Sequence, residues 1–308
     1  MKGRVLKSTG SWYKVVGSDG KYYQCRIRGK LKLHNIKTTN PVAVGDIVIF
    51  DLEQEGEERH GIISKIEERT NYIIRKSVHK KGFGHVLAAN IDQLLLMITL
   101  KNPKTSLGFI DRLLVNSESF RIPAVLLFNK IDAMSSKDMI MIKKLSSIYK
   151  KLGYESYSIS ALEGTGIRPV ESILKNRVTL IAGHSGVGKS TFVNGLDAEV
   201  AQQIREISAF SKKGKHTTTF AEMFEIGEST YIIDSPGIKE LGMIDMEDWE
   251  ISHYFPEMRQ FLGECKFKDC LHVQEPGCAV IQSLEKGEIE ESRFLSYLSM
   301  LENDDNRR

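Results

Sequence analysis

The chain has 308 residues, of which 41% are hydrophobic and 27% are charged, and its net charge is only +3. This length allows two or three domains, and this composition excludes a disordered, collagen-like or coiled-coil chain. The longest apolar run, residues 91–100, is interrupted by Asp92 and Gln93 and is far shorter than the ~20 residues that span a bilayer. The N-terminus has no apolar segment of a secretory signal, so we expect a cytoplasmic protein with no membrane partner.

The charge is unevenly distributed along the chain. Residues 1–40 contain ten lysines and arginines against a single acid, Asp19, whereas residues 241–308 contain seven basic and fifteen acidic residues. A basic end is suited to a polyanion such as nucleic acid, although a solvated lysine-rich surface would have the same composition.

Residues 1–70 contain short β-branched and aromatic runs separated by turn residues such as Ser18-Asp19-Gly20. About five strands in this length predict an N-terminal OB-like β-barrel, a form that commonly binds nucleic acid. Aromatic and basic side chains alternate here, which suits stacking on bases and neutralising phosphates. Half of the aromatic residues must still fill the barrel core, so core packing stays the simpler interpretation of any one of them. The aromatic residues are Trp12, Tyr13, Tyr22 and Tyr23, and the basic ones Lys14, Lys21, Arg26 and Arg28.

A basic connector at 71–85 is followed by alternating apolar strands and amphipathic helices up to about residue 242. This alternation predicts an α/β domain with a mostly parallel sheet and right-handed crossovers. The expected strands lie within 91–100, 123–132, 154–160, 177–183 and 229–234, and the expected helices within 108–120, 137–153, 167–175 and the segment after residue 188. From about residue 243 the chain is acidic and helical. We therefore expect three domains, 1–70, 71–242 and 243–308.

Residues 183–190, GHSGVGKS, match the phosphate-loop pattern G-x-x-x-x-G-K-[ST] and follow an apolar strand. The glycines let backbone N–H groups wrap phosphates, and the next helix adds the positive end of its dipole. Lys189 is expected to reach the β- and γ-phosphates, and the Ser190 hydroxyl to ligate Mg²⁺. The loop residues predicted to bind the nucleotide are Gly183, His184, Ser185, Gly186, Val187, Gly188, Lys189 and Ser190.

Two further motifs also follow apolar strands. Asp234 begins the tetrapeptide DSPG, and an acid at a strand end can hold Mg²⁺ through water. Gly237 is the last residue of this tetrapeptide. Because glycine has no side chain in the way, the Gly237 N–H can approach the γ-phosphate.

The tetrapeptide NKID at 129–132 discriminates between bases. The Asp132 carboxylate can accept from the two donors on guanine N1 and N2, whereas adenine would leave the charge unpaired. Asn129 can contact the O6/N7 side of the base, and the Lys130 stem can cover the ring. The loop SAL at 160–162 can supply a backbone contact to guanine O6. The residues predicted to bind the base are Asn129, Lys130, Ile131, Asp132, Ser160 and Ala161.

The order of these motifs is the most specific feature of the chain. In ordinary GTPases the phosphate loop precedes the base-reading motif, but here NKID and SAL precede GHSGVGKS and DSPG. The same site can form if the chain is cut and rejoined elsewhere, so the sequence predicts a circularly permuted GTPase. The switch segment after Gly237 then leads directly into the C-terminal domain.

The segment SKKGKHTTT at 211–219 is predicted to be the switch that closes on Mg²⁺ and the γ-phosphate. We take Thr218 as the switch ligand, although the spacing does not choose among the three threonines. Many GTPases place a water-orienting glutamine after D-x-x-G, but this chain has Ile238, so slow unassisted hydrolysis is expected. Our hypothesis is that His216 positions the water once a partner orders the loop; the alternative is a solvent-exposed or RNA-facing histidine.

A cysteine and histidine cluster lies near the C-terminus, with the spacing C-x4-C-x-H-x5-C. Three thiolates and one imidazole predict a closed, structural Zn²⁺ site, although buried thiols would have the same pattern. The ligands would be Cys265, Cys270, His272 and Cys278. The fourth cysteine, Cys25, falls on a predicted barrel strand and is expected in the core.

With the barrel in front, the permuted motifs and the cysteine cluster behind, the whole chain resembles the ribosome small subunit-dependent GTPase A family (RsgA, YjeQ, YloQ). The resemblance implies a late maturation factor that binds the small ribosomal subunit and its rRNA and hydrolyses GTP to GDP when bound there. It also implies phosphate and Mg²⁺ binding from Gly183 through Thr191, and an apolar residue after DSPG. We expect a monomer. The alternative is a nucleotide-gated RNA-binding module in which hydrolysis is incidental.

Overall fold

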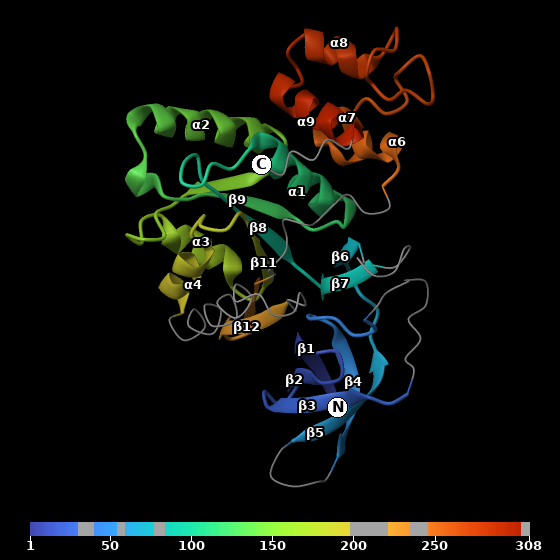
Figure 1. Ribbon diagram of the computed structural model, residues 1–308, viewed down its shortest axis with the longest axis vertical. Coiled ribbons are helices and arrows are strands. Elements are labelled where there is room, and N and C mark those ends of the chain that lie inside the picture. Colours follow the sequence, from blue (N-terminus) through green and yellow to red (C-terminus); the bar gives the residue numbers. More distant parts are fainter. Residues whose placement is uncertain (30–39, 54–58, 77–83, 198–220, 235–245, 303–308) are drawn as a thin grey trace.

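The computed structural model describes residues 1–29, 40–53, 59–76, 84–197, 221–234 and 246–302. Three parts follow one another along the longest axis: a barrel at one end, an α/β part in the middle and a helical part at the other end (Figure 1). Within these residues no helix has the length and apolar character needed to cross a membrane.

Five strands form the predicted N-terminal barrel: β1 (Lys2–Ser8), β2 (Tyr13–Gly17), β3 (Tyr22–Ile27), β4 (Ile47–Glu53) and β5 (His60–Ile66). They pair in the order β1-β2-β3-β5-β4, and a further pairing of β1 with β4 closes the barrel. β3 and β5 run parallel, and the other pairs are antiparallel. Alternate residues turn inward, as the period of two requires, and Cys25 is fully buried among them.

The α/β part contains the predicted sheet, with strands in the order β10-β9-β8-β11-β13-β12. These strands are β8 (Gln93–Ile98), β9 (Ala124–Phe128), β10 (Glu155–Ser158), β11 (Val178–Ala182), β12 (Glu222–Gly227) and β13 (Thr230–Asp234). All neighbours are parallel except β12 and β13. The sequence did not predict the antiparallel strand β12. The strand of NKID, β9, and the strand of the phosphate loop, β11, both pair with β8, so the permuted order brings the two motifs together.

Helices cover both faces of this sheet. Along β8, Leu94 and Leu96 pack toward α1 (Leu107–Ser119) and α2 (Ser136–Lys151). Leu95 and Met97 pack toward α3 (Ile167–Leu174) and α4 (Lys189–Leu196). β8 is therefore buried on both faces, which explains the unbroken apolar run that follows Gln93 in this strand.

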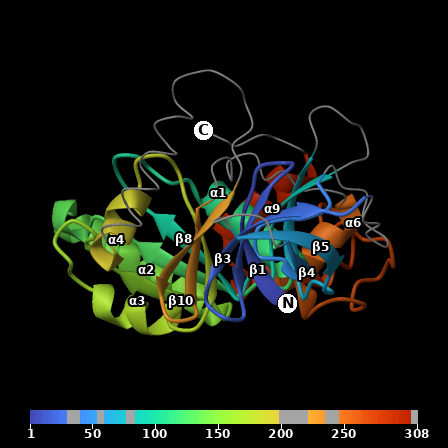
Figure 2. The same cartoon turned by 90° about the horizontal axis from the view of Figure 1, so that it is seen from below.

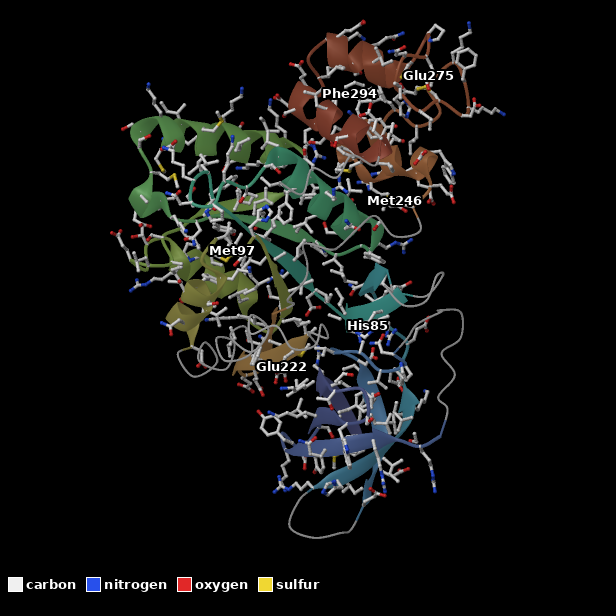
Figure 3. All side chains as sticks on the ribbon, viewed as in Figure 1. His85, Met97, Glu222, Met246, Glu275 and Phe294 are labelled. Atoms are coloured by element: carbon white, nitrogen blue, oxygen red, sulfur yellow. The ribbon has the colours of Figure 1, made fainter. Side chains whose placement is uncertain are left out.

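The connector between barrel and sheet is more ordered than expected. β6 (Tyr72–Lys76) and β7 (Gly84–Ala89) form a separate two-stranded sheet. Gly45 has a φ of +89°, and a Cβ there would lie 2.0 Å from the Ala89 carbonyl oxygen, so only glycine fits this junction. The barrel also continues the central sheet, because β1 pairs with β12, and Lys7 Nζ lies 2.9 Å from the Glu222 carboxylate. Figure 3 labels Glu222 where the barrel meets the α/β part.

The C-terminal part consists of short helices that pack against α1. They are α6 (Asp248–Ile251), the 3₁₀ turn η3 (Ser252–Tyr254), α7 (Pro256–Arg259), α8 (Ala279–Glu285) and α9 (Glu291–Leu301). Their apolar cluster includes Val115 of α1 beside Phe255, Tyr297 and Met300. Seen from the barrel end (Figure 2), α6 and α9 lie behind the barrel strands, whereas α3 and α4 lie to one side.

Candidate nucleotide site and metal centre

The phosphate loop connects β11 to α4 and depends on glycine at two close approaches. A Cβ on Gly183 would lie 2.6 Å from the Met97 carbonyl oxygen, and one on Gly188 would lie 2.4 Å from Asn129 Nδ2. Both glycines have positive φ, 145° and 102°. A backbone curl of this kind before a helix N-terminus is what a phosphate cradle requires.

The side chains predicted to act on phosphate lie at the start of α4. Lys189 Nζ donates to the carbonyl oxygens of Gly183 at 2.7 Å and His184 at 3.1 Å, so the ammonium stays at the mouth of the loop. Ser190 is half-buried and Thr191 is exposed.

Asn129 joins three segments that are far apart in the sequence. Its side chain is 2% exposed. Asn129 Nδ2 donates to the Val187 carbonyl oxygen at 2.7 Å, and Asn129 Oδ1 accepts from the Ala161 N–H at 3.0 Å. The NKID motif, the phosphate loop and the SAL loop therefore meet on one amide group. Sequence reasoning assigned Asn129 to the base and missed this tethering role.

The other residues of the predicted base site surround this junction. Lys130 has a φ of +65° and its ammonium donates to the Asn102 carbonyl oxygen. The Ile131 N–H donates to the Ile159 carbonyl oxygen at 3.2 Å, and Asp132 is exposed in the turn η1 (Ile131–Ala133). Ser160 is fully buried and its hydroxyl accepts from the Glu163 N–H at 3.1 Å, which shapes the SAL loop.

A ring stack that the sequence did not reveal supports the phosphate loop. The His184 imidazole lies on the Phe109 ring, with centroids 3.9 Å apart and planes 26° from parallel. Phe109 lies in the first turn of α1 and is 7% exposed. Its place in an amphipathic helix indicated only core packing.

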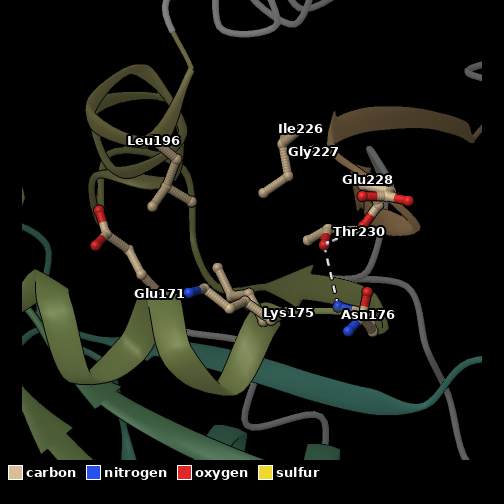
Figure 4. A pocket seen from close by; sticks show the side chains of 9 residues that line it. Glu171, Lys175, Asn176, Leu196, Ile226, Gly227, Glu228 and Thr230 are labelled. Carbon is tan, nitrogen blue, oxygen red and sulfur yellow. Dashed lines mark hydrogen bonds between the residues drawn. The ribbon is translucent and has the colours of Figure 1, made fainter.

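Three predicted residues, His216, Thr218 and Gly237, lie outside the described residues. The backbone of Asp234 ends β13, which pairs with β11 and places this residue beside Ile181. A cavity of about 440 Å³ lies between the C-terminal ends of α3 and α4 and the β12–β13 turn (Figure 4). It is lined by Lys175 and Asn176, which precede β11, so it lies away from the phosphate loop.

The four predicted metal ligands converge in the C-terminal part. The ligand atoms of Cys265, Cys270, His272 and Cys278 all lie within 4.8 Å of one another. His272 Nδ1 lies 3.5 Å from Cys265 Sγ and 3.3 Å from Cys278 Sγ, and these two sulfurs are 3.9 Å apart. Burial lowers the pKa of His272 and so favours the neutral imidazole that binds metals. This donor set fits one metal ion.

Glu275 organises the loop between His272 and Cys278. Its carboxylate accepts from the N–H groups of Leu271 and Val273 at 2.7 Å and of Gln274 at 3.0 Å. Figure 3 shows Glu275 beside the yellow sulfur atoms. A single acid in an acidic region carried no signal of this role.

The barrel divides its aromatic residues between core and surface. Tyr13 and Tyr23 are 1% and 5% exposed, whereas Trp12 and Tyr22 are 42% and 49% exposed. Lys14 Nζ lies 4.8 Å from the centre of the Tyr22 ring, and Trp12 meets His60 edge-on. Trp12, and separately Tyr22 with its lysine, are exposed aromatic rings of the kind on which bases of single-stranded nucleic acid can stack.

Comparison with known proteins agrees with this architecture. The family described as RsgA GTPase matches residues 66–244, and the RsgA N-terminal domain matches residues 2–63. The chain belongs to the RsgA GTPase family. It is 50% identical to the "Small ribosomal subunit biogenesis GTPase RsgA" of Christiangramia forsetii over 99% of this chain and 97% of that protein. The RsgA protein of Bacteroides fragilis is also 50% identical, over 98% and 96%.

Solved structures of RsgA relatives have the same fold. The crystal structure of YjeQ from Thermotoga maritima superposes with a TM-score of 0.79 at 31% identity, covering 100% of this chain and 99% of that one. YloQ, described as a circularly permuted GTPase, gives a TM-score of 0.73 at 26% identity over 100% and 96%.

Proposed function

We propose that this protein is a GTPase that acts in small ribosomal subunit biogenesis, binds that subunit and its rRNA, and hydrolyses GTP to GDP and phosphate when bound there. The names of its near full-length relatives support the ribosomal part of this proposal. The nucleotide part rests on Asn129, whose amide ties the base-reading motif to the phosphate loop despite the permuted order. We further propose that the protein is a cytoplasmic monomer with three domains, 1–70, 71–242 and 243–308.

The nucleotide would bind across the C-terminal ends of β9 and β11. Asp132 would accept from guanine N1 and N2, and the Ala161 N–H would approach O6, while the loop from Gly183 to Thr191 would hold the phosphates. Lys189 would leave the loop carbonyls for the β- and γ-phosphates. Ser190 and Asp234 would hold Mg²⁺, which neutralises charge that develops on the phosphates.

The remaining catalytic assignments concern the switch segments. Thr218 would ligate Mg²⁺, and the Gly237 N–H would approach the γ-phosphate. His216 would orient the attacking water once the subunit orders its loop. This dependence on a partner suits a chain with Ile238 in place of a glutamine.

The metal would be Zn²⁺ with a structural role. A tetrahedral ion with Zn–S bonds of about 2.3 Å separates two thiolates by about 3.8 Å, close to the 3.9 Å between Cys265 and Cys278. With four protein ligands the site has no open position for catalysis.

Nucleotide specificity tests the base-reading assignment. Asp132→Asn should move the preference from GTP to XTP, because the new amide pairs with the xanthine O2 in place of the guanine amino group. An unchanged preference for GTP would contradict it. The alternative function, a nucleotide-gated RNA-binding module, predicts nucleotide-dependent subunit binding with a hydrolysis rate that subunits do not change.

A further inference from the structure

A buried ion network fastens the C-terminal part to α1. Arg293 of α9 is 1% exposed. Its Nη1 lies 2.6 Å from Asp111 Oδ1, and its Nε and Nη2 lie 2.6 and 3.2 Å from the two oxygens of Glu257. Asp111 Oδ1 also accepts from the Tyr149 hydroxyl at 2.8 Å. The Arg293 guanidinium of α9 therefore binds α7 through Glu257 and α1 through Asp111. Asp111 in turn links this network to α2 through Tyr149.

This network depends on its single cation. Asp111 and Glu257 bring two carboxylates into the interior against one guanidinium, and Asp111 Oδ2 has no hydrogen-bond partner among the described residues. Without Arg293 both carboxylates would stay buried without a counter-charge, which the protein interior does not tolerate. The position of α1 against the C-terminal part is therefore tied to this side chain.

Helix α1 also supports the phosphate loop, through Phe109, which precedes Asp111 by two residues. Phe109 and Asp111 are about 200° apart around the helix and about 3 Å apart along it. α1 therefore presents Phe109 to His184 of the phosphate loop and Asp111 to Arg293. The preceding loop also reaches this site, since Pro103 Cδ would lie 3.5 Å from a Cβ on Gly186 and the Asn102 carbonyl accepts from Lys130.

We propose that Arg293 is a positioning residue for the phosphate loop: it fixes α1, and α1 fixes the ring that supports His184. The inference rests on the proposed nucleotide site and adds the C-terminal part to the structure that shapes it. Because binding couplings are reciprocal, nucleotide bound at the loop also stabilises α9.

The test uses the full-length, zinc-loaded protein and fluorescent mant-GDP. Arg293→Met and Phe109→Leu should each weaken mant-GDP binding at least fivefold, and the double variant should be no more than twofold weaker than either, because both act through α1. Arg259→Gln is the matched control. It removes the exposed pair of Arg259 with Glu118 at the other end of α1 and should leave affinity within twofold.

Hydrogen exchange supplies a second arm that keeps α9 intact. GDP should slow amide exchange in α9 of the wild-type protein, and Phe109→Leu should abolish that slowing at saturating GDP. If Arg293→Met loses its zinc and its affinity cannot be interpreted, the hydrogen-exchange experiment alone decides the test. Wild-type affinity in zinc-loaded Arg293→Met, or undiminished slowing in Phe109→Leu, would overturn the inference. Failure of the wild-type protein to bind mant-GDP would instead overturn the proposed function.

Discussion

Replacing Asn129 with alanine should loosen the phosphate loop before any nucleotide is present. The change leaves the buried Val187 carbonyl and the partly buried Ala161 N–H without the partners they have at 2.7 and 3.0 Å. Each unsatisfied group costs about 1–3 kcal/mol, or about 2–6 kcal/mol together. A cost of about 1.4 kcal/mol corresponds to a factor of ten. Even the lower cost of about 2 kcal/mol should therefore speed amide exchange roughly thirtyfold at those amides whose local unfolding breaks these two hydrogen bonds.

The assay is hydrogen exchange of the nucleotide-free protein, followed residue by residue through 183–191, with thermal unfolding measured in parallel. At the lower cost the melting temperature should fall by about 4–8 °C. Asp132→Asn is the control within the same motif, because Asp132 is exposed and should change base preference without changing loop exchange. If Asn129→Ala exchanges like the wild-type protein across the loop, the tethering role is refuted.

Three further predictions concern the metal, the pH response and the barrel. Cys278→Ser should lower bound zinc from one per chain to none and melt α8 and α9, seen by metal analysis and circular dichroism; retained helices would contradict a structural ion. The Lys101 ammonium and the Ser135 hydroxyl and N–H lower the pKa of Asp138 to about 2. The cap of α2 should therefore hold above about pH 4 and be lost as pH falls toward 2, measured by NMR; fraying already at pH 5 would oppose this. Trp12→Ala should weaken single-stranded RNA binding about tenfold or more, and binding should fall steeply with salt; salt-independent binding would exclude phosphate contacts.

The sequence predicted those parts of the protein whose chemistry is local. Gly183 and Gly188 have no substitute at their backbone positions, and three cysteines and a histidine that converge are typical of a metal centre, so motif spacing could predict both candidate sites. The alternation of strands and helices likewise predicted the sheet around β8, because its two-faced burial requires an unbroken apolar run.

Contacts between distant segments could not be predicted in the same way. Asn129 resembles a base contact in its tetrapeptide, and only the paired strands show that Val187 and Ala161 lie within reach of its amide. Phe109 and Arg293 look like ordinary residues of amphipathic helices, since neither the ring stack nor the buried ion network leaves a periodic signal. Strand β12 pairs with β13 on one side and with the distant barrel strand β1 on the other, and its own sequence does not reveal the second pairing.

GTP hydrolysis with and without purified small ribosomal subunits tests the central claim most directly. The proposed function predicts slow turnover of the protein alone and stimulation by orders of magnitude when small subunits are added, with His216→Ala reducing the stimulated rate. Turnover that small subunits leave unchanged would contradict a subunit-dependent GTPase.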